Sequence, residues 1–223
     1  MFSELVDVLR CPRPHEESWL VLAAHRLDGR DIMAGVLGCP VCHAEYPIAD
    51  GVARFVNAPD ETSAGASNED EALRLVALLG LTGARGYAVV VGDLTNHAVR
   101  MRELTDVQLL LVNPAATVAM GRGLSGLTIG PRWTKLPLAP ASARAIAFDD
   151  ATMEEQLAAG VEAVVAGGRI LAPVALSLPD GLTELARDDR HWLAEREQAP
   201  RSSGIISLQR GARDAGRRPR DEH

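Results

Sequence analysis

Apolar and polar positions follow different patterns in the two halves of the chain. Residues 1–56 contain short apolar stretches broken by Pro and Gly, which is typical of short β-strands. Residues 71–209 contain longer apolar runs that alternate with segments of helical spacing. Residues 57–70, between them, have few large apolar residues and no basic residue, so we interpret them as a linker. Residues 210–223 are rich in Arg, Gly and Asp, and a disordered tail is expected there.

The second part predicts alternating strands and helices. Strands are expected at 87–91, 107–112, 127–129, 143–148, 168–175 and 204–209. Helices are expected at 71–81, 96–104, 152–166 and 182–196, with a short helix after Pro114. Continuous apolar strands separated by helices indicate a mostly parallel sheet covered on both faces. The predicted fold class is therefore α/β and Rossmann-like, with a small N-terminal β domain.

Charge and composition argue against broad nucleic-acid binding and against membranes as partners. The chain of 223 residues has 23 basic and 30 acidic residues, a net charge of −7, and 4% aromatic residues. This balance argues against broad coating of nucleic acid, and no DNA partner is expected. The apolar stretch 157–178 is interrupted by charged residues and glycines, and no leader-like apolar run opens the sequence. We therefore expect a cytoplasmic protein with reduced thiols and no membrane contact.

Three cysteines point to a metal site. Cys39 and Cys42 form a C-x-x-C turn, which supplies half of a tetrahedral zinc site. Cys11 and His15 are the candidates for the other half, across a C-x-x-x-H spacing. The sequence thus predicts a Zn²⁺ site made of these four side chains. A small β domain would gain much of its stability from such a site.

Other interpretations of the cysteines stay open. His43 could replace His15 as the fourth ligand, although it is adjacent to Cys42. The cysteines could also bind no metal or act as a redox pair. Residues 39–43 match the C-x-x-C-H pattern of c-type haem attachment, which requires an exported chain.

The N-terminal part resembles a known family. LVDVLRCP at 5–12, CPVC at 39–42 and YPIADGV at 46–52 are similar to the small zinc-ribbon proteins that activate tRNA methyltransferases. The resemblance covers residues 1–56 and departs at Pro14, where that family has its second cysteine. It implies a zinc ribbon and a protein partner, for example a methyltransferase, or an RNA partner.

The second part resembles class I methyltransferases that use S-adenosylmethionine. The resemblance covers about residues 70–210 and rests on GGRIL at 167–171 and LPLAPASARAIAFD at 136–149. It implies a cofactor site at Gly92, Asp93 and Asn113. However, that family needs Gly-x-Gly-x-Gly after its first strand and an acidic residue after its second, and this chain keeps one glycine and an asparagine. One predicted strand follows the last predicted helix, so the sheet is expected to lack one strand of the family's set.

Two functions from different classes follow. The first is a non-catalytic protein, in which a zinc ribbon and a degenerate methyltransferase-like domain act as a binding module or scaffold. The alternative is an active methyltransferase with an atypical cofactor loop, acting on RNA or a small molecule. A third possibility is a purely structural subunit.

The remaining candidate residues have ordinary structural interpretations. Asp149 and Asp150 follow a predicted strand and are expected to cap the next helix. His97 and His191 are expected at the surface, and Trp192 is expected to pack its helix against the sheet.

Overall fold

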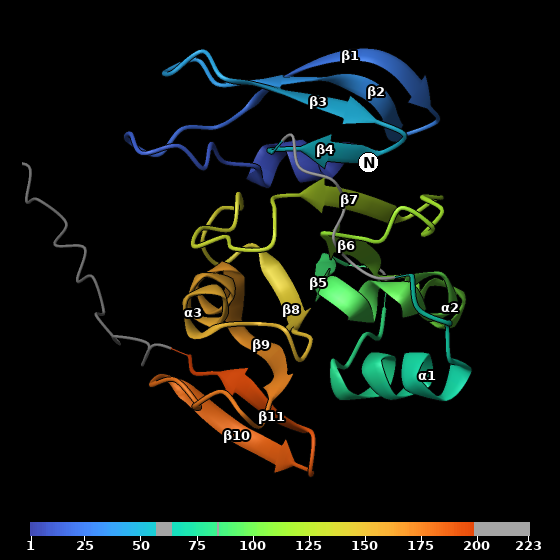
Figure 1. The fold of residues 1–223 in the computed structure, drawn as a ribbon, viewed down its shortest axis with the longest axis vertical. Coiled ribbons are helices and arrows are strands. Elements are labelled where there is room, and N and C mark those ends of the chain that lie inside the picture. The colour runs from blue at the N-terminus through green and yellow to red at the C-terminus, as the bar shows by residue number, and fades with distance from the viewer. Residues whose placement is uncertain (57–63, 84, 199–223) are drawn as a thin grey trace, which may run out of the picture.

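The computed structural model describes residues 1–56, 64–83 and 85–198. These residues form one sheet in the order β1-β2-β3-β4-β7-β6-β5-β8-β9-β11-β10 (Figure 1). The first four strands are β1 (Val21–Asp28), β2 (Asp31–Gly38), β3 (Glu45–Ala49) and β4 (Val52–Arg54). The others are β5 (Tyr87–Val91), β6 (Gln108–Val112), β7 (Leu124–Thr128), β8 (Ala143–Ala147), β9 (Val164–Pro173), β10 (Leu182–Arg187) and β11 (His191–Arg196). The helices are α1 (Glu69–Leu78), α2 (Ala98–Leu104), α3 (Glu154–Ala163) and the 3₁₀ helices Ser3–Val8 and Gly92–His97.

The centre of the sheet is parallel and buried on both faces. All residues of β5 and β7 are buried, and β5 pairs in parallel with β6 on one side and β8 on the other. Helices α1 and α2 pack on one face around Leu75 and Met101, whereas α3 packs on the other face around Leu157. Helix α3 approaches β8 closely, since a Cβ at Gly160 would lie 2.3 Å from the Phe148 ring. The predicted α/β class is confirmed, and the core strands β5–β9 are parallel as expected.

The N-terminal strands extend this sheet. Strand β4 pairs in parallel with β7, and Val52 lies opposite Gly126. Glycine is needed there because a Cβ would lie 2.8 Å from the Val52 side chain. Phe2 also contacts Tyr87, with ring centroids 6.0 Å apart. The N-terminal part and the core therefore share one continuous sheet.

The helix expected at 182–196 is wrong. The segment forms a hairpin, in which β11 lies antiparallel between β9 and β10. Its Leu, Ala, Glu and Arg residues are good helix formers, so local propensity favoured a helix. The Asp188 carboxylate instead accepts the N–H groups of Arg190 (2.8 Å) and His191 (2.7 Å), which fixes a tight turn. Trp192 accordingly lies on a strand.

Other differences from the sequence predictions are smaller. The sheet was expected to be one strand short after residue 182. The hairpin supplies two strands there, so that expectation is wrong. The segment after Pro114 forms a turn closed by the Val118 N–H and the Ala115 carbonyl (2.9 Å), not a helix. The strand expected at 204–209 lies outside the described residues. In the described part of the chain, no helix has both the length and the apolar character needed to cross a bilayer.

Candidate functional site

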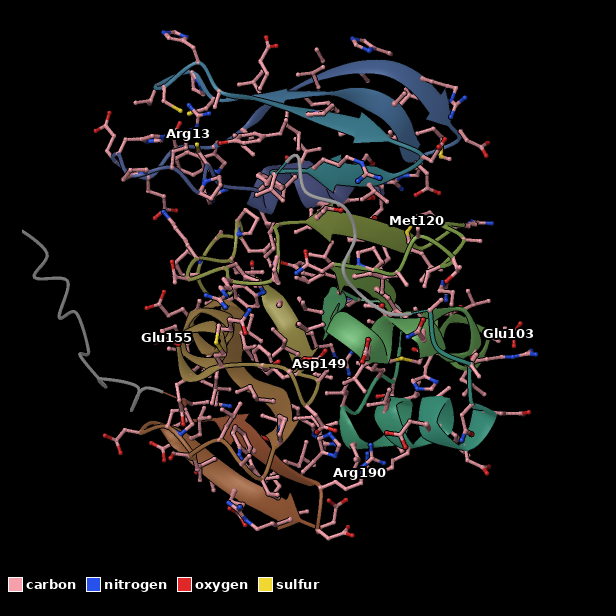
Figure 2. All side chains as sticks on the ribbon, in the orientation of Figure 1. Arg13, Glu103, Met120, Asp149, Glu155 and Arg190 are labelled. Atoms are coloured by element: carbon pink, nitrogen blue, oxygen red, sulfur yellow. The ribbon has the colours of Figure 1, made fainter. Side chains whose placement is uncertain are left out.

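Four side chains converge at one end of the N-terminal strands, near Arg13 in Figure 2. The Sγ atoms of Cys11, Cys39 and Cys42 and a ring nitrogen of His15 all lie within 4.8 Å of one another. Cys11 and Cys42 have their sulfurs 3.7 Å apart, and Cys39 Sγ lies 3.5 Å from His15 Nε2. Zn–S bonds of about 2.3 Å and Zn–N bonds of about 2.0–2.1 Å require tetrahedral edges of about 3.8 and 3.5 Å. The donor set and its spacing therefore fit a tetrahedral ion.

A tight turn presents two of these ligands. The Cys39 N–H donates to the Ala44 carbonyl (2.9 Å), and the His43 N–H donates to the Cys39 carbonyl (3.0 Å). His43 has φ of +55° and an exposed side chain, and it is not part of the cluster. The structure thus brings His15 to the three cysteines and leaves His43 outside them.

Neighbouring groups orient the ligands. His15 Nδ1 lies 2.5 Å from the Glu16 carbonyl oxygen, which can only accept, so Nδ1 carries the proton and Nε2 offers its lone pair to the cluster. The Tyr46 hydroxyl lies 3.3 Å from Cys11 Sγ. Burial, reinforced by the neighbouring Cys11 sulfur, raises the pKa of Tyr46 well above its usual value, so the hydroxyl stays protonated and donates to the sulfur.

The three thiols differ in acidity. Burial raises the pKa of Cys11. Burial acts in the same direction on Cys39, but hydrogen bonds from the backbone N–H groups of Cys42 and Val41 outweigh it and lower the pKa of Cys39 to about 6. Cys39 is therefore a thiolate at neutral pH, which is the form that binds a metal ion.

A second feature lies where the strand order reverses, between β5 and β8. Open α/β sheets bind ligands at the carboxyl ends of strands at such a point. Here the Asp149 carboxylate spans the two strand ends: it accepts the Asp93 N–H at 2.9 Å and the Thr152 hydroxyl at 2.9 Å. Gly92 has φ of +58°, and a Cβ there would lie 1.8 Å from Asp149 Oδ2. An internal carboxylate thus binds the loop N–H at the predicted cofactor position (Figure 2).

The loop after β5 is compact. It enters the 3₁₀ helix Gly92–His97 directly, and the Thr95 hydroxyl donates to the Gly92 carbonyl at 2.6 Å. Leu94 and Thr95 are both buried. A glycine-rich cofactor loop keeps its backbone open to a ligand, whereas this loop packs its own side chains into the core.

Asn113 binds a different part of the chain. It has φ of +52°, its Oδ1 accepts the N–H groups of Ile129 (2.8 Å) and Gly130 (3.1 Å), and its Nδ2 donates to the Gly130 carbonyl (2.8 Å). The side chain therefore ties the end of β6 to the chain after β7. Of the predicted cofactor residues, Gly92 and Asp93 meet at Asp149, and Asn113 turns to β7.

We expect Asn113→Ala to lower the free energy of unfolding by about 2–3 kcal/mol, because it strands two N–H groups and strains a left-handed residue. Asn113→Gly tolerates the positive φ and should lose less. Urea denaturation measures both variants. Equal stability of the alanine variant and the wild type would contradict this role.

Three sequence expectations about single residues are wrong. Asp149 and Asp150 do not cap α3: the Met153 N–H at its start donates to Gln156 Oε1 (2.8 Å) instead. His191 is buried at 2% exposure rather than lying at the surface, and Arg74 Nη2 donates to its Nδ1 (3.5 Å). Burial, reinforced by the neighbouring charge of Arg74, lowers the pKa of His191 and so favours its neutral form.

The other histidine also has a partner. His97 is half-buried, and its Nδ1 accepts the Asn68 N–H at 3.0 Å. Sequence spacing could not reveal these contacts. The one local signal for Asp149 was its position directly after a buried apolar strand.

No protein-family model and no curated protein matches the sequence. Among solved structures, the chain is similar to geranyl diphosphate C-methyltransferase from Streptomyces coelicolor, crystallised with Mg²⁺, geranyl-S-thiolodiphosphate and S-adenosyl-L-homocysteine. The identity is 15% over 47% of this chain and 42% of that chain, with a TM-score of 0.40. The chain therefore spans less than half the length of that enzyme.

Two further structures cover more of the chain. A Methanococcus maripaludis protein, described as an S-adenosyl-L-methionine-dependent methyltransferase, is 8% identical over 59% of this chain and 86% of that chain, with a TM-score of 0.44. A Corynebacterium glutamicum protein is 11% identical over 62% and 85%, with a TM-score of 0.46.

The strand order of the core is that of an open, mostly parallel α/β sheet. The seven strands β7-β6-β5-β8-β9-β11-β10 run in one direction except β11, which is antiparallel to both neighbours. The core therefore has a Rossmann-like α/β fold, preceded by β strands that carry a possible Cys/His metal site.

Proposed function

We propose that this protein is a non-catalytic binding module, in which a zinc ribbon is joined to a methyltransferase-type domain that does not use S-adenosylmethionine. The observation that carries this proposal is the Asp149 carboxylate at the switch point, bonded to the Asp93 N–H at 2.9 Å. A cofactor placed there would have to displace this carboxylate from the loop.

Displacement is costly. Asp149 is 8% exposed and accepts from both the Asp93 N–H and the Thr152 hydroxyl. A buried donor or acceptor that loses its partner costs about 1–3 kcal/mol, and more when it is charged. A carboxylate-bearing ligand would also meet the negative charge of Asp149. These costs oppose binding of the amino-acid part of S-adenosylmethionine.

Zn²⁺ is the proposed metal ion. Cys11, His15, Cys39 and Cys42 supply four protein ligands, which leaves no open position for a substrate or water. The ion would therefore be structural and would hold the loops at the end of β1–β3 together. Such an ion contributes directly to folding.

The proposed partner is a protein, for example a methyltransferase in the cytoplasm. The resemblance of the ribbon to methyltransferase activators supports a protein partner. The net charge of −7 disfavours RNA, because contacts to phosphates depend on Lys and Arg. Co-purification from the native cell, with and without ribonuclease, distinguishes the two partners.

Calorimetric titration of the zinc-loaded protein with S-adenosylmethionine tests this function. We expect no saturable heat up to millimolar cofactor. The variant Asp149→Ala removes the internal carboxylate, and Asp150→Ala is its matched control on the exposed neighbour. Micromolar binding by the wild type would overturn the proposal and favour an active methyltransferase with an atypical loop. Methyl transfer that is lost in Asp93→Ala would then identify the activity.

A further inference from the structure

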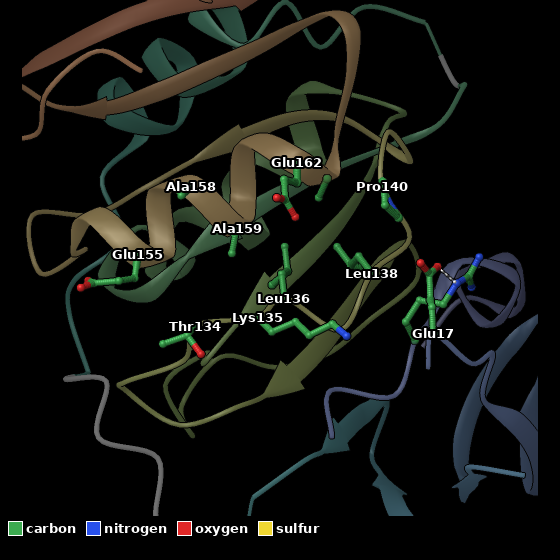
Figure 3. Close-up of a pocket in the computed structure, with 12 residues that line it drawn as sticks. Glu17, Thr134, Lys135, Leu136, Leu138, Pro140, Glu155, Ala158, Ala159 and Glu162 are labelled. Atoms are coloured by element: carbon green, nitrogen blue, oxygen red, sulfur yellow. Dashed lines mark hydrogen bonds and ion pairs between the residues drawn. The ribbon is translucent and has the colours of Figure 1, made fainter. Parts of the chain in front are cut away.

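A cavity of about 410 Å³ lies between the N-terminal segment and α3 (Figure 3). Two short backbone contacts fix its walls: the Arg10 N–H donates to the Pro137 carbonyl (3.0 Å), and the Ala139 N–H donates to the Val8 carbonyl (2.7 Å). The volume is in the range of small-molecule sites. Neither Asp149 nor any residue of the cysteine cluster is among the residues that line it.

The Arg10 guanidinium borders the cavity and is held in place by its neighbours. Its side chain is only 8% exposed and lies over the Trp19 ring at 4.3 Å. Nε donates to Glu17 (2.9 Å), and Nη1 donates to the carbonyls of Asp7 (3.2 Å) and Leu9 (3.0 Å). Nη2 has no partner among the described residues.

The Arg10 side chain borders the cavity, and its Nη2 keeps some exposure. Within the described ranges, no buried side-chain nitrogen or oxygen lacks a hydrogen-bond partner. Nη2 must therefore remain accessible, and Arg10 lines the cavity. A largely buried guanidinium with one open N–H₂ group is a ready donor for a carboxylate.

Lys135 and Glu162 add an unpaired cation and an unpaired anion. Both line the cavity, and neither side chain has a hydrogen bond or ion pair to any residue that the structure describes, including each other; only the Glu162 backbone carbonyl is bonded, to the Ala141 N–H (2.9 Å) and to Arg196 (3.0 Å). Figure 3 shows the Lys135 side chain extending toward Glu17, whereas Glu162 descends from α3. The cavity thus presents separate positive and negative positions.

Apart from the charged residues and Thr134, the lining is apolar. The apolar residues are Leu136, Leu138, Pro140, Ala158, Ala159 and Ala163. The charged lining residues are two cations (Arg10 and Lys135) and three carboxylates (Glu17, Glu155 and Glu162), so a dianion such as phosphate would meet net negative charge. A neutral zwitterion with an apolar body avoids that cost and can pair both of its charges.

We propose that this cavity binds a free α-amino acid with an apolar side chain. Its carboxylate contacts Lys135 and Arg10 Nη2, its ammonium group contacts Glu162, and its side chain lies on Leu136 and Leu138. The site is independent of the proposed binding-module function.

Amide-detected NMR titration of the zinc-loaded protein tests the site with three probes. L-leucine carries both charges, 4-methylpentanoate lacks the ammonium group, and 3-methylbutylamine lacks the carboxylate. We expect saturable shifts for L-leucine at residues of the α3 wall, and binding at least tenfold weaker for the two truncated probes.

Charge-removing variants assign the two ends. Lys135→Gln should weaken binding of L-leucine and 4-methylpentanoate about tenfold and leave binding of 3-methylbutylamine unchanged. Glu162→Gln should weaken binding of L-leucine and 3-methylbutylamine about tenfold and leave binding of 4-methylpentanoate unchanged. Both residues are exposed, so the variants should fold. Asp180→Asn, an exposed carboxylate away from the cavity, is the matched control. Absence of saturable L-leucine binding at millimolar concentration, or binding that neither cavity variant changes, would overturn the proposal.

Discussion

Replacement of Cys39 by serine is expected to abolish stoichiometric zinc binding and to unfold the N-terminal strands. Structural Zn²⁺ has an apparent binding free energy of about 10–16 kcal/mol, which exceeds the total stability of many domains. Metal analysis of the purified protein measures the ion, and hydrogen exchange of the β1–β3 amides measures the unfolding. A strong chelator added to the wild type should reproduce both effects.

Histidine variants are the matched control for this prediction. His15→Ala should lower zinc affinity, because His15 Nε2 lies 3.5 Å from Cys39 Sγ within the cluster. His43→Ala should retain one zinc ion, because His43 is exposed and outside the cluster. Loss of zinc in the His43 variant alone would show that the ligand set is wrong. A fully folded, zinc-free Cys39 variant would show that the ion is not structural.

The loss is expected to spread beyond the ribbon. Phe2, Leu5 and Leu9 are buried in the same apolar cluster as Tyr87 and Leu138 of the core. Strand β4 also supplies the hydrogen-bond partner of β7. Protection of β7 amides should therefore fall with that of the ribbon, whereas β5 lies between two core strands and should stay protected.

The second large effect is expected for Trp192→Ala. Trp192 is fully buried in β11, and its Nε1 donates to the Leu176 carbonyl at 2.9 Å. Removing a buried tryptophan costs about 3–5 kcal/mol, because the lost burial is joined by the cavity that remains. Chemical denaturation measures the change in the free energy of unfolding.

Trp19→Ala is its matched control. Trp19 is 60% exposed and contacts the Arg10 guanidinium, so its removal should cost about 1 kcal/mol or less. Equal losses in the two variants would contradict the hairpin placement of Trp192.

The core strands could be predicted from the sequence because their burial leaves a direct local signal. Strands β5, β6 and β8 fall on the largely apolar stretches expected at 87–91, 107–112 and 143–148, where Gln108 and Arg144 are the only polar residues. A strand covered on both faces needs apolar residues at every position, so its pattern does not depend on its neighbours. The C-x-x-C turn carries a comparable local signal for a metal site.

The hairpin β10–β11 could not be predicted in the same way. Its residues favour a helix by propensity, and β10 is an exposed edge strand with one buried residue, Leu182. The segment becomes a strand because β11 pairs with β9 on one side and with β10 on the other. In the pairing with β9, Leu193 lies opposite Leu171. That partner is distant in sequence, so tertiary pairing overrides local preference.

The sequence by itself indicated the α/β class, the parallel core and a metal site made of three cysteines and a histidine. Only the tertiary structure separated His15 from His43, joined the N-terminal strands to β7, and placed Asp149 on the Asp93 N–H. It also brought Arg10, Lys135 and Glu162 to one cavity. The physical reason is sequence separation. Periodicity and motif spacing report on contacts between residues a few positions apart, whereas these contacts join positions that only the folded sheet brings together.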